Sequence, residues 1–278
     1  MNLTWNSNLR NRVTVGLLGG PAILFCAFYG GYLFLAFTLL IGFVSIYEMR
    51  LMGKAIGYQV IDISSYLFCA AVFFDSYFFQ MDHLYLLTLI YMVVILLEAL
   101  VSDKENKLHE LSYKFISASY IVFFLAPLIL MRELDYQNGY GEGGKVVAVI
   151  FLGIWFLDTL AYFGGKIFGR HKLVPRISPK KTVEGSIAGI IGCLIAVFAA
   201  RAVFYPEMNW DNALALAIII GVTGQIGDMI ESFFKRKTGI KDSSSILPGH
   251  GGILDRFDSL IFIAPFAYLY VKWMVALP

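Results

Sequence analysis

Apolar residues occur along this chain in long runs that short polar stretches separate. Each run approaches the roughly 20 residues that an α-helix needs to cross the hydrocarbon core of a bilayer. We therefore expect transmembrane helices near residues 13–29, 31–49, 60–78, 83–101, 112–131, 146–166, 183–204, 211–232 and 257–276. Gly30 and Gly31 leave almost no connection between the first two helices, so the chain must turn sharply there.

The composition supports the same architecture. Hydrophobic residues make up 58% of the 278 positions and charged residues 15%, whereas soluble domains average roughly 45–50% and about 25%. We predict an all-α, polytopic integral membrane protein with about nine transmembrane helices, formed as a single transmembrane catalytic domain over residues 1–278. The net charge of +2 gives no indication of nucleic-acid binding.

The distribution of basic residues predicts the orientation. Short cytoplasmic loops of membrane proteins collect Lys and Arg. With nine helices and a cytoplasmic N-terminus, all but four of the 22 basic residues fall on the cytoplasmic side. The four exceptions are Arg132, Lys145, Arg201 and Lys272. The number of helices and the orientation therefore support each other.

Two of the predicted cytoplasmic loops, 167–182 and 233–256, are long, basic and rich in Gly, Pro and Ser. Ionisable side chains at the ends of membrane helices are costly and are therefore candidates for function. Five carboxylates lie at the ends of the helices that adjoin these loops: Asp158, Glu184, Asp228, Glu231 and Asp258. We expect a polar cavity that faces the cytoplasm. For any single one of these five carboxylates, the plainer interpretation is a charge at the solvated membrane interface.

Helical spacing sharpens this expectation. Residues three and four apart share a helix face, so Asp228, Glu231, Ser232 and Lys235 form one polar stripe on an apolar helix. Mg²⁺ is typically held by one or two carboxylates together with phosphate oxygens and water. We expect the ligands to be Asp228 and Asp255, which lie near the two ends of the second loop.

Basic residues around such a metal would neutralise phosphate charge. The candidates are Lys180, Lys181, Lys235, Arg236, Lys241 and Arg256. The alternative for each is an anchor that contacts anionic lipid headgroups. For Lys235 and Arg236, next to the acidic stripe, we favour function because perturbed charges cluster at sites.

A glycine-rich turn, LPGHGG, lies in the second loop. Glycine permits positive φ and close backbone approach, so Gly251 and Gly252 could present bare N–H groups to a phosphate. A re-entrant turn that needs glycine for its own geometry is the alternative. For His250 a proton carrier, a phosphate donor and a turn residue are all open, and we favour phosphate contact.

The same residues carry a resemblance to a known family. The set Ser232, Lys235-Arg236, Lys241-Asp242, Leu247-Pro248, His250-Gly251-Gly252, Asp255-Arg256 and Asp258 resembles the signature of the phosphatidate cytidylyltransferases, or CDP-diacylglycerol synthases. An earlier set is similar to that family's second conserved stretch: Trp155, Asp158, Ala161-Tyr162, Gly165, Gly169, Pro175, Ser178-Pro179-Lys180-Lys181-Thr182 and Glu184-Gly185. The two sets cover the C-terminal half of the chain.

The resemblance implies a Mg²⁺-dependent enzyme, with one or two metal ions, that joins CTP to phosphatidate and releases pyrophosphate. It also implies a homodimer in a bacterial-type inner membrane, with the active site cytoplasmic. The residues that we expect to act in catalysis are Asp228, Asp255, Lys235, Arg236, Lys241 and His250. Those that we expect to bind substrate are Asp158, Lys180, Lys181, Glu184, Ser232, Gly251, Gly252, Arg256 and Asp258.

Two alternatives compete with this interpretation. A transporter or channel also carries intramembrane carboxylates, but it would place charges near the midplane and show repeat symmetry, whereas the charges here crowd one interface. Another transferase that uses CTP or a lipid phosphate remains open. The motif expected of CDP-alcohol phosphotransferases is absent from the sequence.

Overall fold

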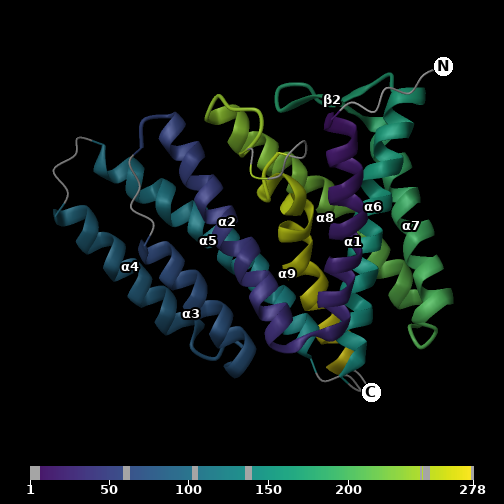
Figure 1. Ribbon diagram of the computed structural model, residues 1–278, viewed down its shortest axis with the longest axis horizontal. Helices are drawn as coiled ribbons and strands as arrows, with labels where there is room; N and C mark the ends of the chain where they lie inside the picture. Colours follow the sequence, from purple (N-terminus) through teal and green to yellow (C-terminus); the bar gives the residue numbers. More distant parts are fainter. Residues whose placement is uncertain are drawn as a thin grey trace. The chain divides into compact units, whose positions relative to one another are not determined.

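The computed structural model describes residues 7–58, 63–101, 106–134, 140–244, 246 and 251–276. Within these residues the chain forms nine helices and two short strands. They are α1 (Ser7–Tyr29), α2 (Gly31–Ala55), α3 (Ile63–Phe79), α4 (Leu84–Val101), α5 (Lys107–Glu133), α6 (Gly141–Phe168), β1 (Lys172–Val174), β2 (Ser178–Thr182), α7 (Val183–Phe204), α8 (Trp210–Lys237) and α9 (Leu254–Ala276). Figure 1 labels the helices and the strand β2. Every apolar run of the sequence coincides with one of these helices.

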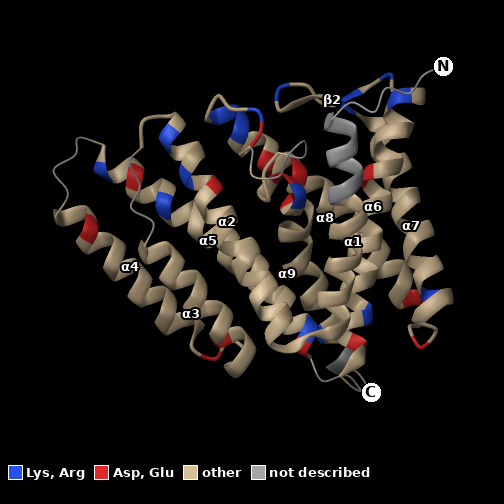
Figure 2. Cartoon of the chain, viewed as in Figure 1, with Lys and Arg blue, Asp and Glu red and all other residues tan. Residues whose placement is uncertain are grey.

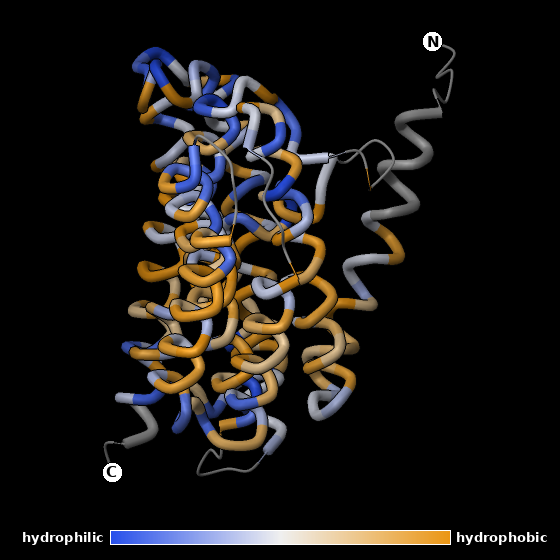
Figure 3. The backbone as a smooth tube through the Cα atoms, turned by 90° about the vertical axis from the view of Figure 1, so that its left-hand side faces the viewer, coloured by the Kyte–Doolittle hydropathy of each residue, from blue (hydrophilic) through white to orange (hydrophobic). Residues whose placement is uncertain are grey.

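The chain is a multi-pass membrane protein. Six helices in the described residues are long and apolar enough to cross a bilayer, namely α2, α4, α5, α6, α7 and α8. Along the helices, hydrophobic residues occupy the middle and hydrophilic residues gather towards the ends (Figure 3). Lys, Arg, Asp and Glu follow the same distribution (Figure 2). That α1, α3 and α9 also span the membrane stays a prediction.

A small antiparallel hairpin was not predicted. Strands β1 and β2 pair with Lys172 opposite Thr182 and Val174 opposite Ser178. The sequence between α6 and α7 contains Pro175 and Pro179 and lacks the apolar alternation that marks a half-buried strand. The hairpin therefore gives no periodic signal, and the sequence predicts only a loop over residues 167–182.

The chain divides into two compact units. Unit 1 comprises Met1–Val122 and Lys237–Phe257, and unit 2 comprises Phe123–Arg236 and Asp258–Pro278. Helices α5, α8 and α9 contribute residues to both units. The single domain over residues 1–278 stays a prediction.

Unit 1 contains the turn that the Gly30-Gly31 pair predicts. Both glycines have positive φ, 70° and 58°, in the region that glycine adopts without the steric cost of a Cβ. Helix α1 ends at Tyr29 and α2 begins at Gly31, so the reversal uses no further residues. The predicted sharp turn is confirmed.

The helices of unit 1 pack through aromatic rings. Tyr91 of α4 stacks on Phe68 of α3 with ring centroids 4.3 Å apart, and its hydroxyl lies 3.0 Å from the Ser65 hydroxyl. Tyr113 of α5 lies against Gly53 of α2. Its hydroxyl donates to a backbone carbonyl of α2, that of Met49, at 2.6 Å. Each phenol thus satisfies its polar end while the ring contributes apolar contact.

In unit 2, α7 packs on α6 through a face of small residues. A Cβ at Gly189 would lie 2.9 Å from the Leu157 carbonyl oxygen, and one at Gly192 would lie 2.7 Å from the Phe156 carbonyl oxygen. Small residues allow this backbone approach, which drives helix association where lipid removes the hydrophobic incentive. The contact places the start of α7, and the hairpin before it, beside the end of α6.

Replacing Gly192 with Val should weaken this interface. The branched side chain would overlap the α6 backbone, at a cost of about 1–3 kcal/mol. We expect the unfolding temperature in detergent to fall by about 5 °C, at roughly 2–4 °C per kcal/mol. The control is Ile191→Val, because Ile191 is 49% exposed on the same helix. Equal melting temperatures for the two variants would contradict the packing described.

Candidate active site

Helices α8 and α9 approach each other through backbone atoms in unit 2. A Cβ at Gly227 would lie 2.7 Å from the Asp258 carbonyl oxygen, closer than side-chain atoms tolerate. One turn earlier, the Ser259 hydroxyl donates to the Gly224 carbonyl at 3.1 Å. The close approach of the two backbones brings Asp228, the neighbour of Gly227, next to Asp258.

A cluster of carboxylates forms at this contact. Asp228, Glu231 and Asp258 each offer an oxygen, and these atoms all lie within 4.8 Å of one another. Glu231 is buried, whereas Asp228 and Asp258 are half-buried. Asp158 of α6 is exposed, and it interacts electrostatically with Asp258. Four of the five carboxylates that the sequence singled out therefore lie close together.

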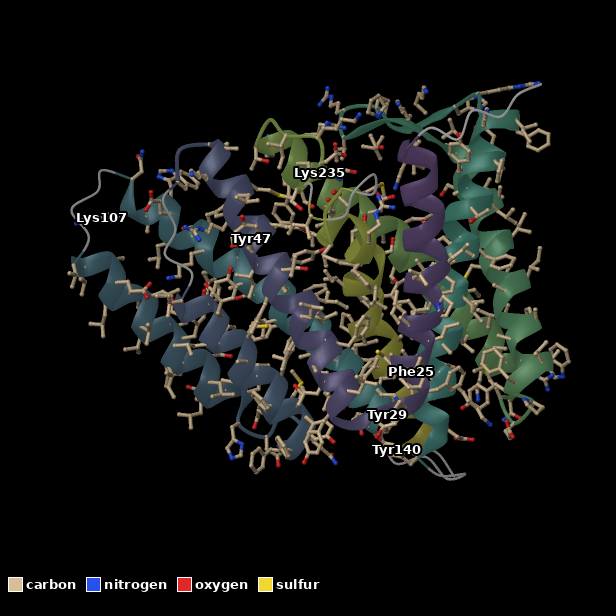
Figure 4. All side chains as sticks on the ribbon, viewed as in Figure 1. Phe25, Tyr29, Tyr47, Lys107, Tyr140 and Lys235 are labelled. Atoms are coloured by element: carbon tan, nitrogen blue, oxygen red, sulfur yellow. The ribbon has the colours of Figure 1, made fainter. Side chains whose placement is uncertain are left out.

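Two lysines pair with this cluster. Lys181, on β2, forms an ion pair with Asp228. Lys235 Nζ lies 2.5 Å from Glu231 Oε2, one helical turn away on α8, and Figure 4 shows its position near the end of that helix. The Ser232 hydroxyl donates to Asp228 Oδ1 at 3.4 Å. The predicted stripe on α8 is confirmed as one polar face.

The hairpin that carries Lys181 is held from both sides. Glu184, in the first turn of α7, accepts hydrogen bonds from the backbone N–H groups of Arg170 and His171, and its Oε1 lies 2.6 Å from His171 Nδ1. Arg236 Nε donates to the Ile177 carbonyl in the hairpin turn at 3.3 Å. Glu184 and Arg236, expected to meet substrate, thus contact the hairpin.

The start of α7 is fixed by its cap. The Thr182 hydroxyl accepts a hydrogen bond from the Gly185 N–H at 3.2 Å, as expected of threonine at a helix N-cap. The strand β2 therefore ends in a defined position, with Lys181 half-buried and Lys180 exposed. Of the two adjacent lysines, the described contact with a carboxylate is made by Lys181.

In unit 1, Gly251 and Gly252 precede α9, and Gly252 contacts Asp255. Gly251 has a φ of 81°, in the region that glycine adopts without the steric cost of a Cβ. The N–H of Gly252 donates to Asp255 Oδ2 at 2.9 Å. The Ser243 N–H donates to the same oxygen at 3.0 Å, and the Ser243 hydroxyl oxygen also lies 3.0 Å from it. The Gly252 N–H, expected to contact phosphate, thus contacts this carboxylate.

A buried carboxylate that sequence reasoning missed completes this arrangement. Glu48 of α2 is 0% exposed and accepts hydrogen bonds from Ser243, Ser244 and the first residues of α9. The sequence did hold a signal, because an ionisable residue at the end of an apolar run is a candidate by default. Functional carboxylates were expected at the ends of the apolar runs that adjoin the two long loops, and α2 adjoins neither loop.

Three other residues predicted for the site are not among the contacts described above. The side chains of Lys241 and Arg256 are exposed. His250 lies outside the described residues. Asp228 and Asp255 belong to different units, so their pairing as metal ligands stays a prediction.

Comparison with known proteins identifies the class. The chain matches the cytidylyltransferase family over residues 10–274, and it belongs to that family. The matched residues include the carboxylate cluster of unit 2 and the group around Glu48 and Asp255 in unit 1.

Individual relatives are bacterial proteins. The chain is 43% identical over 162 residues to a phosphatidate cytidylyltransferase of Staphylococcus aureus (strain COL). It is 41% identical over 162 residues to a protein of the same name from Staphylococcus epidermidis (strain ATCC 12228 / FDA PCI 1200), and 43% identical over 164 residues to one from Staphylococcus haemolyticus (strain JCSC1435). Each match covers 56% of this chain and 62% of the relative.

Gly252 should tolerate no side chain. A Cβ there would lie 1.9 Å from the Ser243 hydroxyl oxygen and 2.4 Å from Glu48 Oε1. We expect Gly252→Ala to displace these groups and to lower the unfolding temperature by several degrees, as overpacking costs about 1–3 kcal/mol. Gly16→Ala on α1 is the control, because nothing lies within 4 Å of a Cβ there. A wild-type melting curve for Gly252→Ala would contradict the geometry.

Proposed function

We propose that the protein transfers a cytidylyl group from CTP to phosphatidate, giving CDP-diacylglycerol and pyrophosphate. The observation that carries the proposal is the cluster of carboxylates and lysines at the ends of apolar helices, in a chain of the cytidylyltransferase family. Relatives that share 43% identity are named phosphatidate cytidylyltransferases. A site at the end of membrane helices suits a reaction between a lipid and a nucleotide dissolved in water.

The reaction needs positioning and charge stabilisation more than covalent catalysis. A phosphate oxygen of phosphatidate forms a bond to the α-phosphorus of CTP, and the bond from that phosphorus to the departing pyrophosphate breaks. Phosphatidate already carries an ionised oxygen near neutral pH, so the nucleophile needs little deprotonation. Negative charge accumulates on the pyrophosphate as it leaves.

We propose that the basic residues bind the phosphates. Lys181 and Lys235 lie next to the carboxylate cluster, and Lys180 and Arg236 belong to the hairpin and to the end of α8. Their ammonium and guanidinium groups donate charge-assisted hydrogen bonds to phosphate oxygens. Lys241 and Arg256 are exposed, as groups that meet a substrate arriving from water must be.

The donor set of the cluster suits Mg²⁺. Hard divalent cations prefer carboxylate oxygens. Three carboxylates each offer an oxygen within 4.8 Å of the others, and the two lysines that pair with them are fewer than these negative charges. We propose that Asp228, Glu231 and Asp258 hold the ion. Asp255 stays a proposed ligand on the strength of the sequence resemblance. Bound Mg²⁺ would polarise phosphate oxygens and neutralise charge on the leaving group.

The orientation and assembly are also proposals. The excess of Lys and Arg in the loops that adjoin the cluster supports a cytoplasmic site under the positive-inside rule. A homodimer stays a prediction that the resemblance alone supports.

The activity can be tested directly. Purified protein supplied with labelled CTP, phosphatidate and Mg²⁺ should release pyrophosphate and form labelled CDP-diacylglycerol. Asp228→Asn and Asp255→Asn should each lower turnover by about 10²–10³-fold, because each removes a proposed ligand of the metal ion that would stabilise charge on the phosphates. Glu207→Gln is the control, since Glu207 pairs with Lys145 away from the cluster. Absence of product with wild-type protein, or full turnover in either Asn variant, would refute the corresponding assignment.

Glu231 gives a separate test of the metal site. Glu231→Gln removes a charge from the cluster but keeps the shape of the side chain. We expect the Mg²⁺ concentration for half-maximal activity to rise by about 10–100-fold, as found when groups that support a metal are altered. Asp211→Asn, in the first turn of the same helix, should leave it unchanged. An unaltered Mg²⁺ requirement in Glu231→Gln would exclude Glu231 from the site.

A further inference from the structure

Glu48 is a fully buried acid on α2, one residue after Tyr47, which is labelled in Figure 4. Its oxygen Oε1 accepts from the Ser244 hydroxyl at 2.5 Å and from the Ile253 N–H at 2.9 Å. Its oxygen Oε2 accepts from the Ser243 hydroxyl at 2.9 Å and from the Leu254 N–H at 2.6 Å. All of these groups belong to unit 1.

The four hydrogen bonds explain why a charge is tolerated there. A buried ion is costly unless its partners satisfy it, and a carboxylate accepts about four hydrogen bonds. Two of the donors, Ile253 and Leu254, are at the N-terminus of α9, where the helix dipole favours negative charge. Glu48 therefore acts as a capping group for α9, although it precedes Leu254, the first residue of that helix, by 206 positions.

Glu48 is joined to Asp255 by a shared neighbour. The Ser243 hydroxyl lies 2.9 Å from Glu48 Oε2 and 3.0 Å from Asp255 Oδ2. Gly252 extends the connection, because its N–H donates to Asp255 and its α-carbon faces both Ser243 and Glu48. The segment that carries Asp255 is thus tied to α2 through one carboxylate.

We infer that Glu48 is a positioning residue for the transfer reaction. It holds Ser243 and the start of α9 so that Asp255 is presented to metal and phosphate in one fixed arrangement. This inference rests on the proposed function, in which Asp255 acts at the site. Glu48 itself touches neither metal nor substrate, since it is enclosed by Ser243, Ser244, Gly252 and α9.

Glu48→Gln separates shape from hydrogen bonding. Each carboxylate oxygen of Glu48 accepts a hydrogen bond from one backbone N–H. In Glu48→Gln, either orientation of the side-chain amide places its NH₂ group against one of these N–H donors, which the main chain holds in place. The matched control is Asp75→Asn. Asp75 is another buried acid of unit 1, 5% exposed, and its partner is His83. Both variants lose a buried charge, but only one alters the surroundings of Asp255.

Three readouts apply to both variants, below their unfolding temperatures. In Glu48→Gln we expect the amides of Ile253 and Leu254 to exchange with deuterium at least about tenfold faster, because a hydrogen bond to a charged group contributes about 1.5–3 kcal/mol. We expect Mn²⁺ binding, followed by paramagnetic resonance, to weaken about 10–100-fold, and kcat to fall by a similar factor. Asp75→Asn should change each value less than about twofold, because the hydrogen bonds of Asp75 are to His83, in the turn between α3 and α4.

Ser243→Ala provides a second variant should Glu48→Gln fail to fold. It keeps the cap on α9 and removes only the hydroxyl between the two carboxylates. We expect weaker Mn²⁺ binding, with exchange at Ile253 and Leu254 unchanged.

The outcomes distinguish this inference from the proposed function. Wild-type Mn²⁺ binding and kcat in Glu48→Gln would overturn it, even with a lowered melting temperature, as would equal losses in Asp75→Asn. Unchanged Mn²⁺ binding in Ser243→Ala would likewise overturn it. Inactive wild-type protein would refute the proposed reaction, while amide exchange and Mn²⁺ binding would still decide the role of Glu48.

Discussion

The backbone contact between α8 and α9 at Gly227 determines which polar groups can meet in unit 2. In a bilayer, burying an apolar face gains little, so helices associate through close contacts of small residues and through hydrogen bonds between them. With no side chain at Gly227, the Asp258 carbonyl approaches α8, and the Ser259 hydroxyl reaches the Gly224 carbonyl. The glycine face of α7 does the same against α6, which sets the position of the hairpin and of Lys181. The carboxylate cluster is therefore a product of backbone packing as much as of its own charges.

Two of the three clustered carboxylates form ion pairs with lysines, which offset the cost of charge in low-dielectric surroundings. Lys181 pairs with Asp228, and Lys235 with Glu231. Glu48 is satisfied in a different way, by hydroxyl and backbone N–H groups and by the dipole of α9. The first kind of partner is a charged side chain that can be exchanged for a ligand, whereas the backbone N–H groups on Glu48 belong to the main chain and cannot leave. Asp228 and Glu231 thus suit binding, and Glu48 suits support.

Sequence reasoning succeeded where the controlling distances are local. Apolar runs near 20 residues marked the helices, and the spacing of Asp228, Glu231 and Lys235 placed them on one face. It could not foresee the Lys181–Asp228 pair, because which of two adjacent lysines turns inward depends on the strand β2. Nor could it foresee the contact of Glu48 with Leu254, which joins residues 206 positions apart. The hairpin was not predicted, because its strands carry no alternating apolar pattern. The pairing of Asp228 and Asp255 as metal ligands stays a prediction.

The ion pair of Lys181 with Asp228 has a thermodynamic consequence for ligand uptake. A divalent cation that binds Asp228 competes with the ammonium group for the same carboxylate, and Lys181 is left with an uncompensated charge beside a membrane. An anion such as a polyphosphate restores neutrality by accepting that ammonium group. Cation and anion therefore favour each other's binding by linkage, and each should raise the affinity for the other by the same factor. Under the proposed function, neither ligand alone replaces what the pair provides, so the site would bind the metal and the nucleotide in combination.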